Sequence, residues 1–260
     1  MEKLIFGLFG VLVIGVLVLV GLLIHHEIKV SCLVSGVVVE KKFTPGHVEI
    51  MPESDGQGGT TYRIMKVLIA CEFSGIVREA FTALGHEAWS VDLLPTEIPG
   101  RHVTGDALEE AYGKRWDLMI AHPPCTYLNR AGWHWVNKPD SSTIPLKGEP
   151  RRRAAREAAD FFRALLDAPV PAIAVENPRP IVHAGLPPAT QYIQPWMFGH
   201  GEVKETGPWL KNLPLLTPTN IVDGREARIH KMPPSADRWK ERSRTYAGIA
   251  KAMAEQWGSL

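Results

Sequence analysis

The sequence contains few cysteines. Cys32, Cys71 and Cys125 are the only three in 260 residues. They are odd in number and far apart, and none belongs to a Cys-x-x-Cys pair or a cluster of metal ligands. This pattern fits a reducing compartment and predicts neither zinc nor any other metal site.

The sequence also lacks an excess of either charge. Its 29 Lys and Arg residues and 28 Asp and Glu residues leave a formal net charge of +1. A strongly basic balance would indicate nucleic-acid binding, so a surface of that kind must here be a local patch. Hydrophobic residues make up 45% and charged residues 22% of the chain, which are ordinary values for a globular protein.

One long hydrophobic run is present near the N-terminus. Leu4 to Ile24 contains 21 residues with no charge and no proline. As a helix it would rise about 32 Å, enough to cross a bilayer core of about 30 Å. A small-residue cleavage site does not follow, so we expect residues 1–26 to form a retained transmembrane helix. The lysines after this run favour a membrane anchor with a cytoplasmic C-terminal part.

Residues 27–64 are expected to form a short β-containing segment and a flexible linker. The run Val37-Val38-Val39 favours a strand, whereas residues 52–61 are rich in glycine, serine and threonine. The character of the sequence changes at Met65, which also resembles a start codon. The first 64 residues are therefore either a separate module or an over-extended gene prediction, and a protein that begins at Met65 would be cytoplasmic.

Residues 65–260 alternate short apolar strands with helices. This order predicts an α/β fold with a doubly wound, Rossmann-like sheet. Strands are expected at 66–71, 88–91, 102–104, 117–121 and 171–175, and helices at 76–84, 107–112, 151–167 and 245–257. Residues 126–150 show little periodicity, and a loop of that length is unusual unless it is functional or mobile. The run Arg151-Arg152-Arg153 is interpreted as a solvated helix face rather than a DNA clamp.

Chemically versatile groups follow the ends of successive strands. In open parallel sheets, ligands bind outside these carboxyl ends, so we expect the groups to converge on one crevice. A glycine turn offers backbone N–H groups, and a carboxylate after the second strand can accept hydrogen bonds from ribose hydroxyls. These two features together predict a cofactor that contains adenosine. The sequence has no Gly-x-Gly-x-x-Gly and no Walker lysine, which argues against NAD and nucleoside triphosphates. The strand-end groups are Ser74, Gly75, Asp92, Asp106, Cys125 and Glu176.

Each of these residues also has a simpler structural interpretation. Asp92 and Asp106 could be helix N-caps or turn residues. Cys125, taken alone after two prolines, could be a small buried thiol. The aromatic cluster from Trp133 to Trp135 could belong to the core, although its loop favours contact with a ligand or base. The ordered series carries the prediction, rather than any single residue.

At these positions residues 65–260 resemble the cytosine-5 DNA methyltransferases, most closely the small phage-type members. Phe73-Ser74-Gly75 resembles the first motif of the family, which holds S-adenosylmethionine. Asp92 and Asp106 lie where acidic residues of the family contact the ribose and the adenine. Pro123-Pro124-Cys125 resembles the nucleophile motif and Glu176-Asn177 the motif that contacts the target base. Thr245 to Gly248 resembles the final motif more weakly.

The resemblance implies a Rossmann-like, S-adenosylmethionine-dependent methyltransferase that acts on DNA. Cys125 would add to C6 of a flipped-out cytosine, and Glu176 would hold and protonate N3 while C5 receives the methyl group. The loop after Cys125 would cover the base. The cofactor-binding residues would be Phe73, Ser74, Gly75, Asp92, Asp106 and Pro123, and the substrate-binding residues Asn177, Arg130 and Trp133.

The sequence departs from the family pattern in two places. Val77 stands at the second glycine of the first motif, and no Gln-x-Arg-x-Arg follows Glu176, where Arg179 or Lys204 could substitute. A cofactor analogue in place of S-adenosylmethionine also stays open.

Two other functions stay open as well. In an exocyclic-amino methyltransferase of cytosine N4 or adenine N6, the strand-end motif would be His122-Pro123-Pro124-Cys125 without the usual acceptor and aromatic residues. The second is a membrane-anchored binding protein with a catalytically degenerate core.

Overall fold

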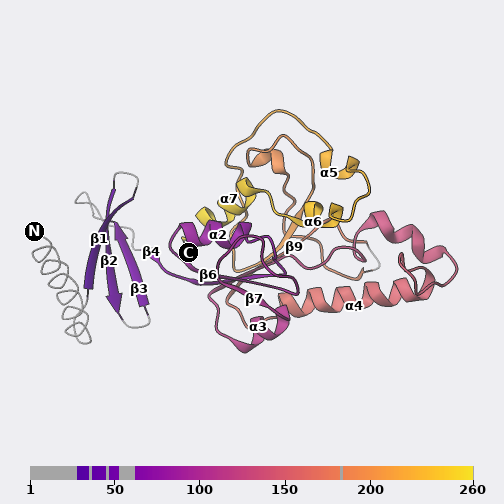
Figure 1. Cartoon of the computed structure of the whole chain (residues 1–260), viewed down its shortest axis with the longest axis horizontal. Helices are drawn as coiled ribbons and strands as arrows, with labels where there is room; N and C mark the ends of the chain where they lie inside the picture. The colour runs from indigo at the N-terminus through magenta and orange to yellow at the C-terminus, as the bar shows by residue number, and fades with distance from the viewer. Residues whose placement is uncertain (1–27, 35–36, 45–46, 53–61, 182–183, 260) are drawn as a thin grey trace, which may run out of the picture. The chain divides into compact units, whose positions relative to one another are not determined.

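The computed structural model describes residues 28–34, 37–44, 47–52, 62–181 and 184–259 (Figure 1). The chain divides into two compact units, Met1–Ile64 and Met65–Leu260. The expected transmembrane helix at Leu4 to Ile24 and almost all of the polar linker lie outside the described residues. Among the helices that are described, none is long and apolar enough to cross a membrane.

The described part of the first unit is a four-stranded antiparallel sheet of order β1-β2-β3-β4. β1 and β2 pair from Ile28↔Phe43 to Val34↔Val37. The β-branched run that begins at Val37 lies in β2, in agreement with its strand propensity. The strands are β1 (Ile28–Val34), β2 (Val37–Thr44), β3 (His47–Pro52) and β4 (Tyr62–Arg63).

The second unit is a mixed α/β unit around a six-stranded, mostly parallel sheet of order β10-β9-β8-β5-β6-β7. The chain starts on β5 inside the sheet, moves outward through β6 and β7, and then returns to β8 and β9 on the other side. This order is compatible with a Rossmann-like fold and places a change of direction between β5 and β8. The strands are β5 (Lys66–Ala70), β6 (Glu87–Asp92), β7 (His102–Thr104), β8 (Leu118–Ala121), β9 (Ala172–Asn177) and β10 (Gly207–Lys211).

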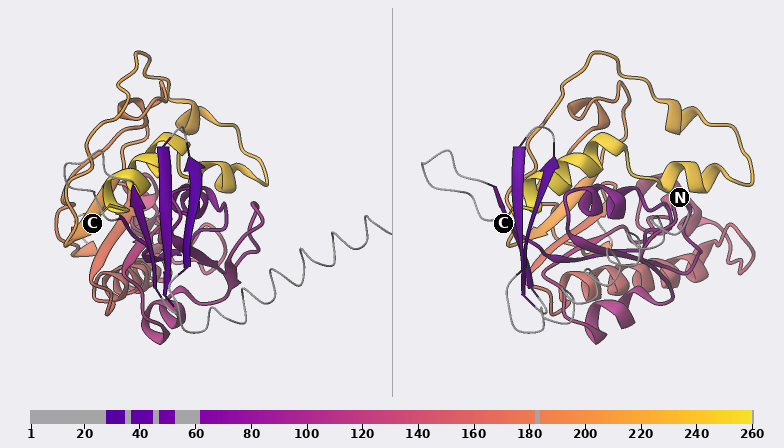
Figure 2. Two further views of the ribbon diagram at one scale, coloured as in Figure 1. Left: turned by 90° about the vertical axis from the view of Figure 1, so that its left-hand side faces the viewer. Right: turned by 60° about the vertical axis from the view of Figure 1, so that its left-hand side comes forward.

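Helices cover both faces of this sheet, with α2 and α7 on one face and α3 and α4 on the other (Figures 1 and 2). Successive strand residues point to opposite faces, so Leu68 and Met119 enter one core while Ile69 and Ile120 enter the other. Burial on both faces explains why the parallel strands are continuous apolar runs. The helices are α2 (Ile76–Ala83), α3 (Ala107–Gly113), α4 (Gly148–Leu166) and α7 (Ala247–Trp257).

The edge strand β10 was not predicted from the sequence. It pairs antiparallel with β9, from Gly207↔Asn177 to Lys211↔Ile173. Proline is tolerated at Pro208 because edge strands do not need every backbone donor. The Trp209 ring packs edge-on against Phe162 of α4, with ring centroids 4.9 Å apart. Shorter elements on either side of β10 are η3 (Pro195–Met197), α5 (Arg228–Lys231) and α6 (Arg238–Ser243).

The loop after β8 is held against α4 by arginines, and it contains the 3-10 helix η1 (Arg130–Asn137). Arg151 is only 4% exposed and donates to the carbonyl oxygen of Thr126 at 3.2 Å, so its interpretation as a solvated residue is wrong. A Cβ atom at Gly132 would overlap the Arg151 guanidinium. Arg152 donates to the carbonyl oxygen of Val136 at 2.7 Å. These contacts order part of a loop whose sequence shows no periodicity.

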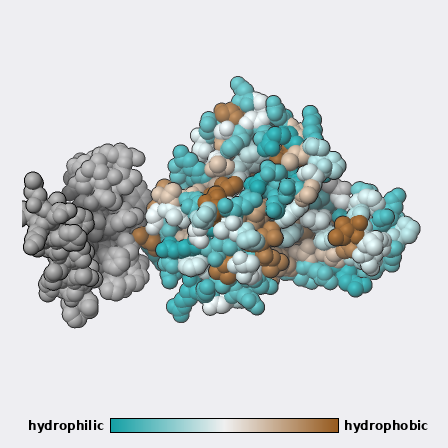
Figure 3. Space-filling view, in the orientation of Figure 1, coloured by the Kyte–Doolittle hydropathy of each residue, from teal (hydrophilic) through white to brown (hydrophobic). Residues whose placement is uncertain are grey.

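The surface of the second unit carries no single broad apolar area on the face shown in Figure 3, where hydrophobic residues form separate patches among hydrophilic ones. The most exposed large hydrophobic residues come from different segments of the chain. They include Leu93, Ile144 and Ile221.

Candidate active site

The turn between β5 and α2 is organised by a buried glutamate. Glu72 is 4% exposed and accepts hydrogen bonds from the backbone N–H groups of Val77 at 2.7 Å and Arg78 at 3.2 Å. Its carboxylate also accepts a bond from the Ser74 hydroxyl at 3.2 Å, and Ser74 in turn accepts one from the Ile76 N–H. The first N–H groups of α2 are thus bonded within the chain rather than offered to a ligand.

Sequence reasoning missed this role of Glu72. An acidic residue just before a predicted helix start was the available signal, since a carboxylate is stabilised near the helix N-terminus. Gly75 has φ of 77°, and a Cβ atom there would lie 2.7 Å from Nη2 of Arg78. The Phe73-Ser74-Gly75 turn therefore has a clear structural reason for its glycine.

Arg78 fixes the segment that follows β6. Its side chain is fully buried and donates to the Ser90 hydroxyl at 2.9 Å and to the carbonyl oxygen of Ile98 at 2.5 Å. It also donates to the Thr96 hydroxyl at 3.2 Å. Asp92 and Leu93 lie between two of these anchored residues, Ser90 and Thr96.

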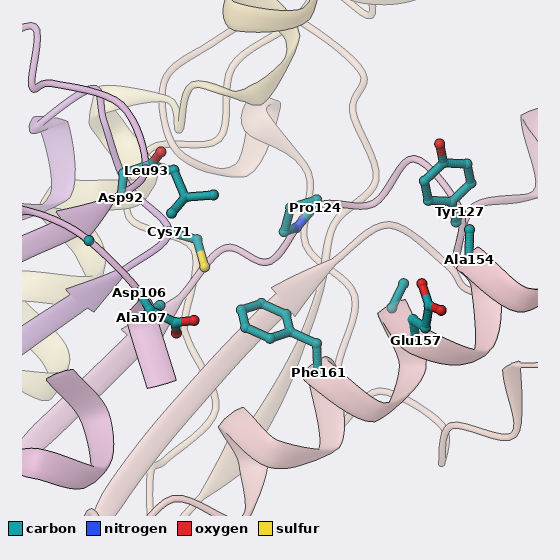
Figure 4. Close-up of a pocket in the computed structure, with 12 residues that line it drawn as sticks. Cys71, Asp92, Leu93, Asp106, Ala107, Pro124, Tyr127, Ala154, Glu157 and Phe161 are labelled. Atoms are coloured by element: carbon teal, nitrogen blue, oxygen red, sulfur yellow. The ribbon is translucent and has the colours of Figure 1, made fainter. Parts of the chain in front are cut away.

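A pocket of about 340 Å³ lies at the carboxyl ends of β5, β6 and β8, beside α3 and α4 (Figure 4). Asp92 and Leu93 lie at one end, Pro124 and the Phe161 ring in the middle, and Tyr127 toward the other end. The predicted residues Asp92 and Asp106 line this pocket, whereas Phe73, Ser74, Gly75 and Pro123 are not among its lining residues. Its complete lining is Cys71, Asp92, Leu93, Gly105, Asp106, Ala107, Pro124, Tyr127, Ala154, Glu157, Ala158 and Phe161.

Both aspartates combine a backbone contact with their place in the pocket. Asp92 accepts a hydrogen bond from the Leu94 N–H at 3.0 Å, and Asp106 is the N-cap of α3, where it accepts one from the Leu108 N–H at 2.7 Å. Burial raises the pKa of Asp92, although the bond from Leu94 opposes this shift. Each backbone bond engages one carboxylate oxygen, so a capping role and a ligand contact are compatible.

Cys71 forms part of the pocket wall and was missed as a site residue. Burial, followed by the negative charges of Asp92 and Asp106, raises the pKa of its thiol to about 12. The thiol is therefore protonated near neutral pH and contributes an uncharged surface.

Cys125 lies in a tight turn just after β8. The His122 N–H donates to the carbonyl oxygen of Ala70 at 2.9 Å, and the two prolines that follow carry no N–H. The Cys125 carbonyl oxygen then accepts bonds from the backbone N–H of Asn129 at 3.1 Å and from its side-chain Nδ2 at 2.9 Å. The same Nδ2 lies 3.9 Å from Sγ of Cys125, where it can donate to a thiolate.

The groups around Cys125 shift the pKa of its thiol in opposite directions. Burial raises the pKa of its thiol, and the carboxylate of Glu176 raises it further. The hydrogen bond from Asn129 and the positive charges of Lys204 and Arg242 lower the pKa without cancelling the rise. In the free protein the thiol is consequently less ionised than an ordinary cysteine at the same pH.

Glu176 lies on β9, next to the turn that carries Cys125. Oε2 of Glu176 lies 3.1 Å from Nδ1 of His122. Burial raises the pKa of this carboxyl, but the hydrogen bond and charge of His122, the charge of Lys204 and the Thr206 hydroxyl outweigh burial and lower it. Asn177, the next residue, is 1% exposed and donates to the carbonyl oxygen of Pro123 at 3.3 Å.

Arg179 and Lys204 were the two basic residues that could replace the missing Gln-x-Arg-x-Arg motif. Lys204 lies close enough to Cys125 and Glu176 for its charge to act on both. Burial lowers the pKa of Lys204, although the charges of Glu176 and Cys125 raise it. The antiparallel pairing of β10 with β9 brings this segment to the site, which sequence periodicity did not predict. Arg179 instead forms an ion pair with Glu205 at 3.0 Å and lies over the Tyr192 ring.

Arg130 and Trp133 lie on η1, away from the lining of the 340 Å³ pocket. Arg130 is exposed. Trp133 packs partly against the core and lines a second pocket of about 700 Å³ beside α4, together with Arg152 and Arg156. Gly248, the last residue of the segment that resembles the final motif of the family, lies in α7. A Cβ atom at this position would overlap the carbonyl oxygen of Phe198.

Two residues that adjoin the Pro123-Pro124-Cys125 turn each have a buried polar atom with no hydrogen-bond partner in the described part of the chain: Nε2 of His122 and Oδ1 of Asn177. Over the same residues, no group of three or more His, Cys, Asp or Glu side chains is arranged to hold a metal ion. Neither the models of known protein families nor the curated protein sequences include a match to this chain.

Proposed function

We propose that residues 65–260 form an S-adenosylmethionine-dependent DNA methyltransferase that modifies C5 of cytosine through Cys125. The observation that carries this proposal is the pairing of Cys125 with Glu176. Cys125 follows β8, and Glu176 lies near the end of the adjacent parallel strand β9. The carboxylate of Glu176 raises the pKa of the Cys125 thiol, and the charge of Lys204 acts on both groups. Pro124, the neighbour of Cys125, lines the pocket that also contains Asp92 and Asp106.

The 340 Å³ pocket suits an adenosyl cofactor. Its volume lies within the usual range of small-molecule sites, about 300–1,000 Å³. Pro124 and Phe161 offer apolar surfaces to a purine ring, and Asp92 and Asp106 can accept hydrogen bonds from hydroxyl and amino groups. The lining residues include three carboxylates and no Lys or Arg, which favours a cationic ligand over a polyphosphate. Bound S-adenosylmethionine would supply an electrophilic methyl group.

The chain's own residues can perform the covalent steps. Cytosine C5 is a poor nucleophile, but formation of a bond between Sγ of Cys125 and C6 makes C5 enamine-like. Glu176 would hold N3 and provide the proton that it takes up, while the positive charge of Lys204 offsets the negative charge of the attacking thiolate. The target base must leave the DNA stack to reach these groups.

The opposite pKa shifts of Cys125 and Glu176 indicate which of the two groups carries a proton before the reaction. In the free protein the raised pKa of Cys125 and the lowered pKa of Glu176 place one proton on the thiol and none on the carboxyl. Attack requires a thiolate and a protonated N3. One proton transferred from Cys125 through Glu176 to N3 satisfies both requirements, and it returns when the thiolate is released.

The test is incubation of the full chain with duplex DNA and S-adenosylmethionine carrying a labelled methyl group, followed by nucleoside analysis. We expect labelled 5-methylcytosine from the wild type and none from Cys125→Ser. Equal product from both proteins would exclude the covalent mechanism. Label on cytosine N4 or adenine N6 would instead support the exocyclic-amino alternative, and cofactor binding without any labelled nucleoside would support the degenerate binding protein.

A further inference from the structure

The imidazole of His122 has one engaged and one unengaged nitrogen. Nδ1 lies 3.1 Å from Oε2 of Glu176, and the side chain is only 9% exposed. Nε2 is buried and has no partner within the described residues. A buried polar atom without a partner costs free energy, so its persistence calls for an explanation. A group that arrives with a ligand would provide one.

The contact with Glu176 determines which nitrogen can act as a base. Because the pKa of Glu176 is lowered, its carboxylate is ionised and accepts the proton of Nδ1. In the neutral imidazole the lone pair then resides on Nε2. A carboxylate that orients a histidine in this way is a recurring feature of general-base sites.

The backbone places this nitrogen close to the proposed chemistry. His122 is fixed to β5 through the carbonyl oxygen of Ala70 and is separated from Cys125 only by two prolines. The register Ala121↔Val175 makes His122 the direct neighbour of Glu176 across β8 and β9. The base, the nucleophile and the N3 contact therefore share one strand end.

We propose that Nε2 of His122 is the base that removes the C5 proton after methyl transfer, an inference that rests on the proposed function. The proton passes from C5 to Nε2, and the electron pair of the broken C–H bond forms the C5=C6 double bond. The C6–Sγ bond breaks, and its electrons return to Cys125 as a thiolate. The proton on N3 returns to Glu176, and the His122 imidazolium later releases its proton to solvent.

Other polar groups near Cys125 are poorer candidates for this step. Asn129 and Thr206 are not bases, and the guanidinium of Arg242 offers donors but no acceptor. Nζ of Lys204 donates a hydrogen bond to the carbonyl oxygen of Arg244 at 3.2 Å. Glu176 is occupied by N3 and by Nδ1 of His122. In a neutral His122 imidazole the unused lone pair lies on Nε2, which makes this nitrogen the candidate base in this set of residues.

The test compares wild type with His122→Asn, whose side-chain amide can keep the donation to Glu176 but offers no basic nitrogen. The first substrate is duplex DNA with 5-fluorocytosine at the target, supplied together with S-adenosylmethionine. After methyl transfer to C5, fluorine stands where the proton to be removed would be, so elimination is blocked. We expect both proteins to form a stable protein–DNA adduct on it. This outcome would establish attack by Cys125 and show that the variant is folded.

The second substrate is duplex DNA with ordinary cytosine and labelled methyl donor. We expect wild type to release 5-methylcytosine without a lasting adduct. His122→Asn should accumulate an adduct that carries the labelled methyl group, with product release slowed by about 100-fold or more. Added imidazole should partly restore release, which a purely structural role of His122 would not explain.

Two results would overturn the assignment of His122. One is product release by His122→Asn at the wild-type rate. The other is a slow variant that forms the 5-fluorocytosine adduct but accumulates no methylated adduct on cytosine, since the defect then lies in another step. If wild type forms no adduct on 5-fluorocytosine, the proposed function itself fails. If His122→Asn does not fold, His122→Gln, which also lacks a basic nitrogen, takes its place in the comparison.

Discussion

Oδ1 of Asp106 accepts a hydrogen bond from the backbone N–H of Leu108 at 2.7 Å, and the same carboxylate lines the 340 Å³ pocket. Substitution can distinguish the capping role of Asp106 from a contact with the ligand, because asparagine caps helices about as well as aspartate but carries no charge. We expect Asp106→Asn to keep the stability of the wild type but to weaken S-adenosylmethionine binding. Asp106→Ala should weaken binding and also lower the free energy of unfolding by about 1 kcal/mol.

Urea unfolding and equilibrium cofactor binding measure these two effects. If Asp106→Asn binds the cofactor as tightly as wild type, the carboxylate serves only as the N-cap of α3.

The reactivity of Cys125 should report the charge of Glu176. Because the pKa of the thiol is raised by burial and by Glu176, its alkylation by iodoacetamide at pH 7.5 should be slower than that of a free cysteine and should accelerate as the pH rises. Glu176→Gln removes a negative charge and should speed alkylation at fixed pH. Lys204→Met removes a positive charge and should slow it.

Peptide mass spectrometry assigns the alkylated residue. Cys71, with its pKa raised to about 12, is the slow internal reference within the second unit. Unchanged Cys125 alkylation in Glu176→Gln would contradict the electrostatic coupling.

Replacement of the buried Arg78 should be costly. Arg78→Met removes the guanidinium that donates to the Ser90 hydroxyl and to the Ile98 carbonyl oxygen, which keeps only the hydrogen bond from the Thr96 hydroxyl. We expect the free energy of unfolding to fall by about 3 kcal/mol, as for other disrupted buried charged networks. The exposed Arg115 provides the matched control, and Arg115→Met should change stability by less than about 0.5 kcal/mol. Equal unfolding curves for both variants would refute the anchoring role.

The loop between β8 and α4 should depend on Arg151. Arg151→Lys keeps the charge but loses the planar fork that reaches the carbonyl oxygens of Leu146 and Thr126. We expect limited proteolysis to cut residues 126–147 several times faster than in wild type. Arg153→Lys, at an exposed position of the same helix, should leave the cleavage rate unchanged. Identical cleavage of all three proteins would show that Arg151 does not order the loop.

Local sequence patterns were sufficient to predict the central elements of the second unit. Short apolar runs, such as the one from Val67 to Ala70, and the helical stripe of α4 predicted their elements because burial on one or two faces imposes a period that local sequence records. The order of strand ends then predicted that Asp92 and Asp106 would lie together, and both line one pocket. Membrane insertion at Leu4 to Ile24 stays a prediction.

The immediate surroundings of Cys125 depend on contacts between distant segments of the chain. The contact between His122 and Glu176 joins residues 54 positions apart in the sequence. Lys204 lies just before β10 and is brought to these residues by the pairing of β10 with β9. Pro208 within β10 argues against a strand when the sequence is considered alone. The sequence likewise does not predict the burial of Arg151, because an arginine at the start of a helix has the same local sequence pattern whether it faces solvent or a loop. Such contacts depend on which distant segments meet, and hydrophobic periodicity does not encode the partners of individual polar atoms.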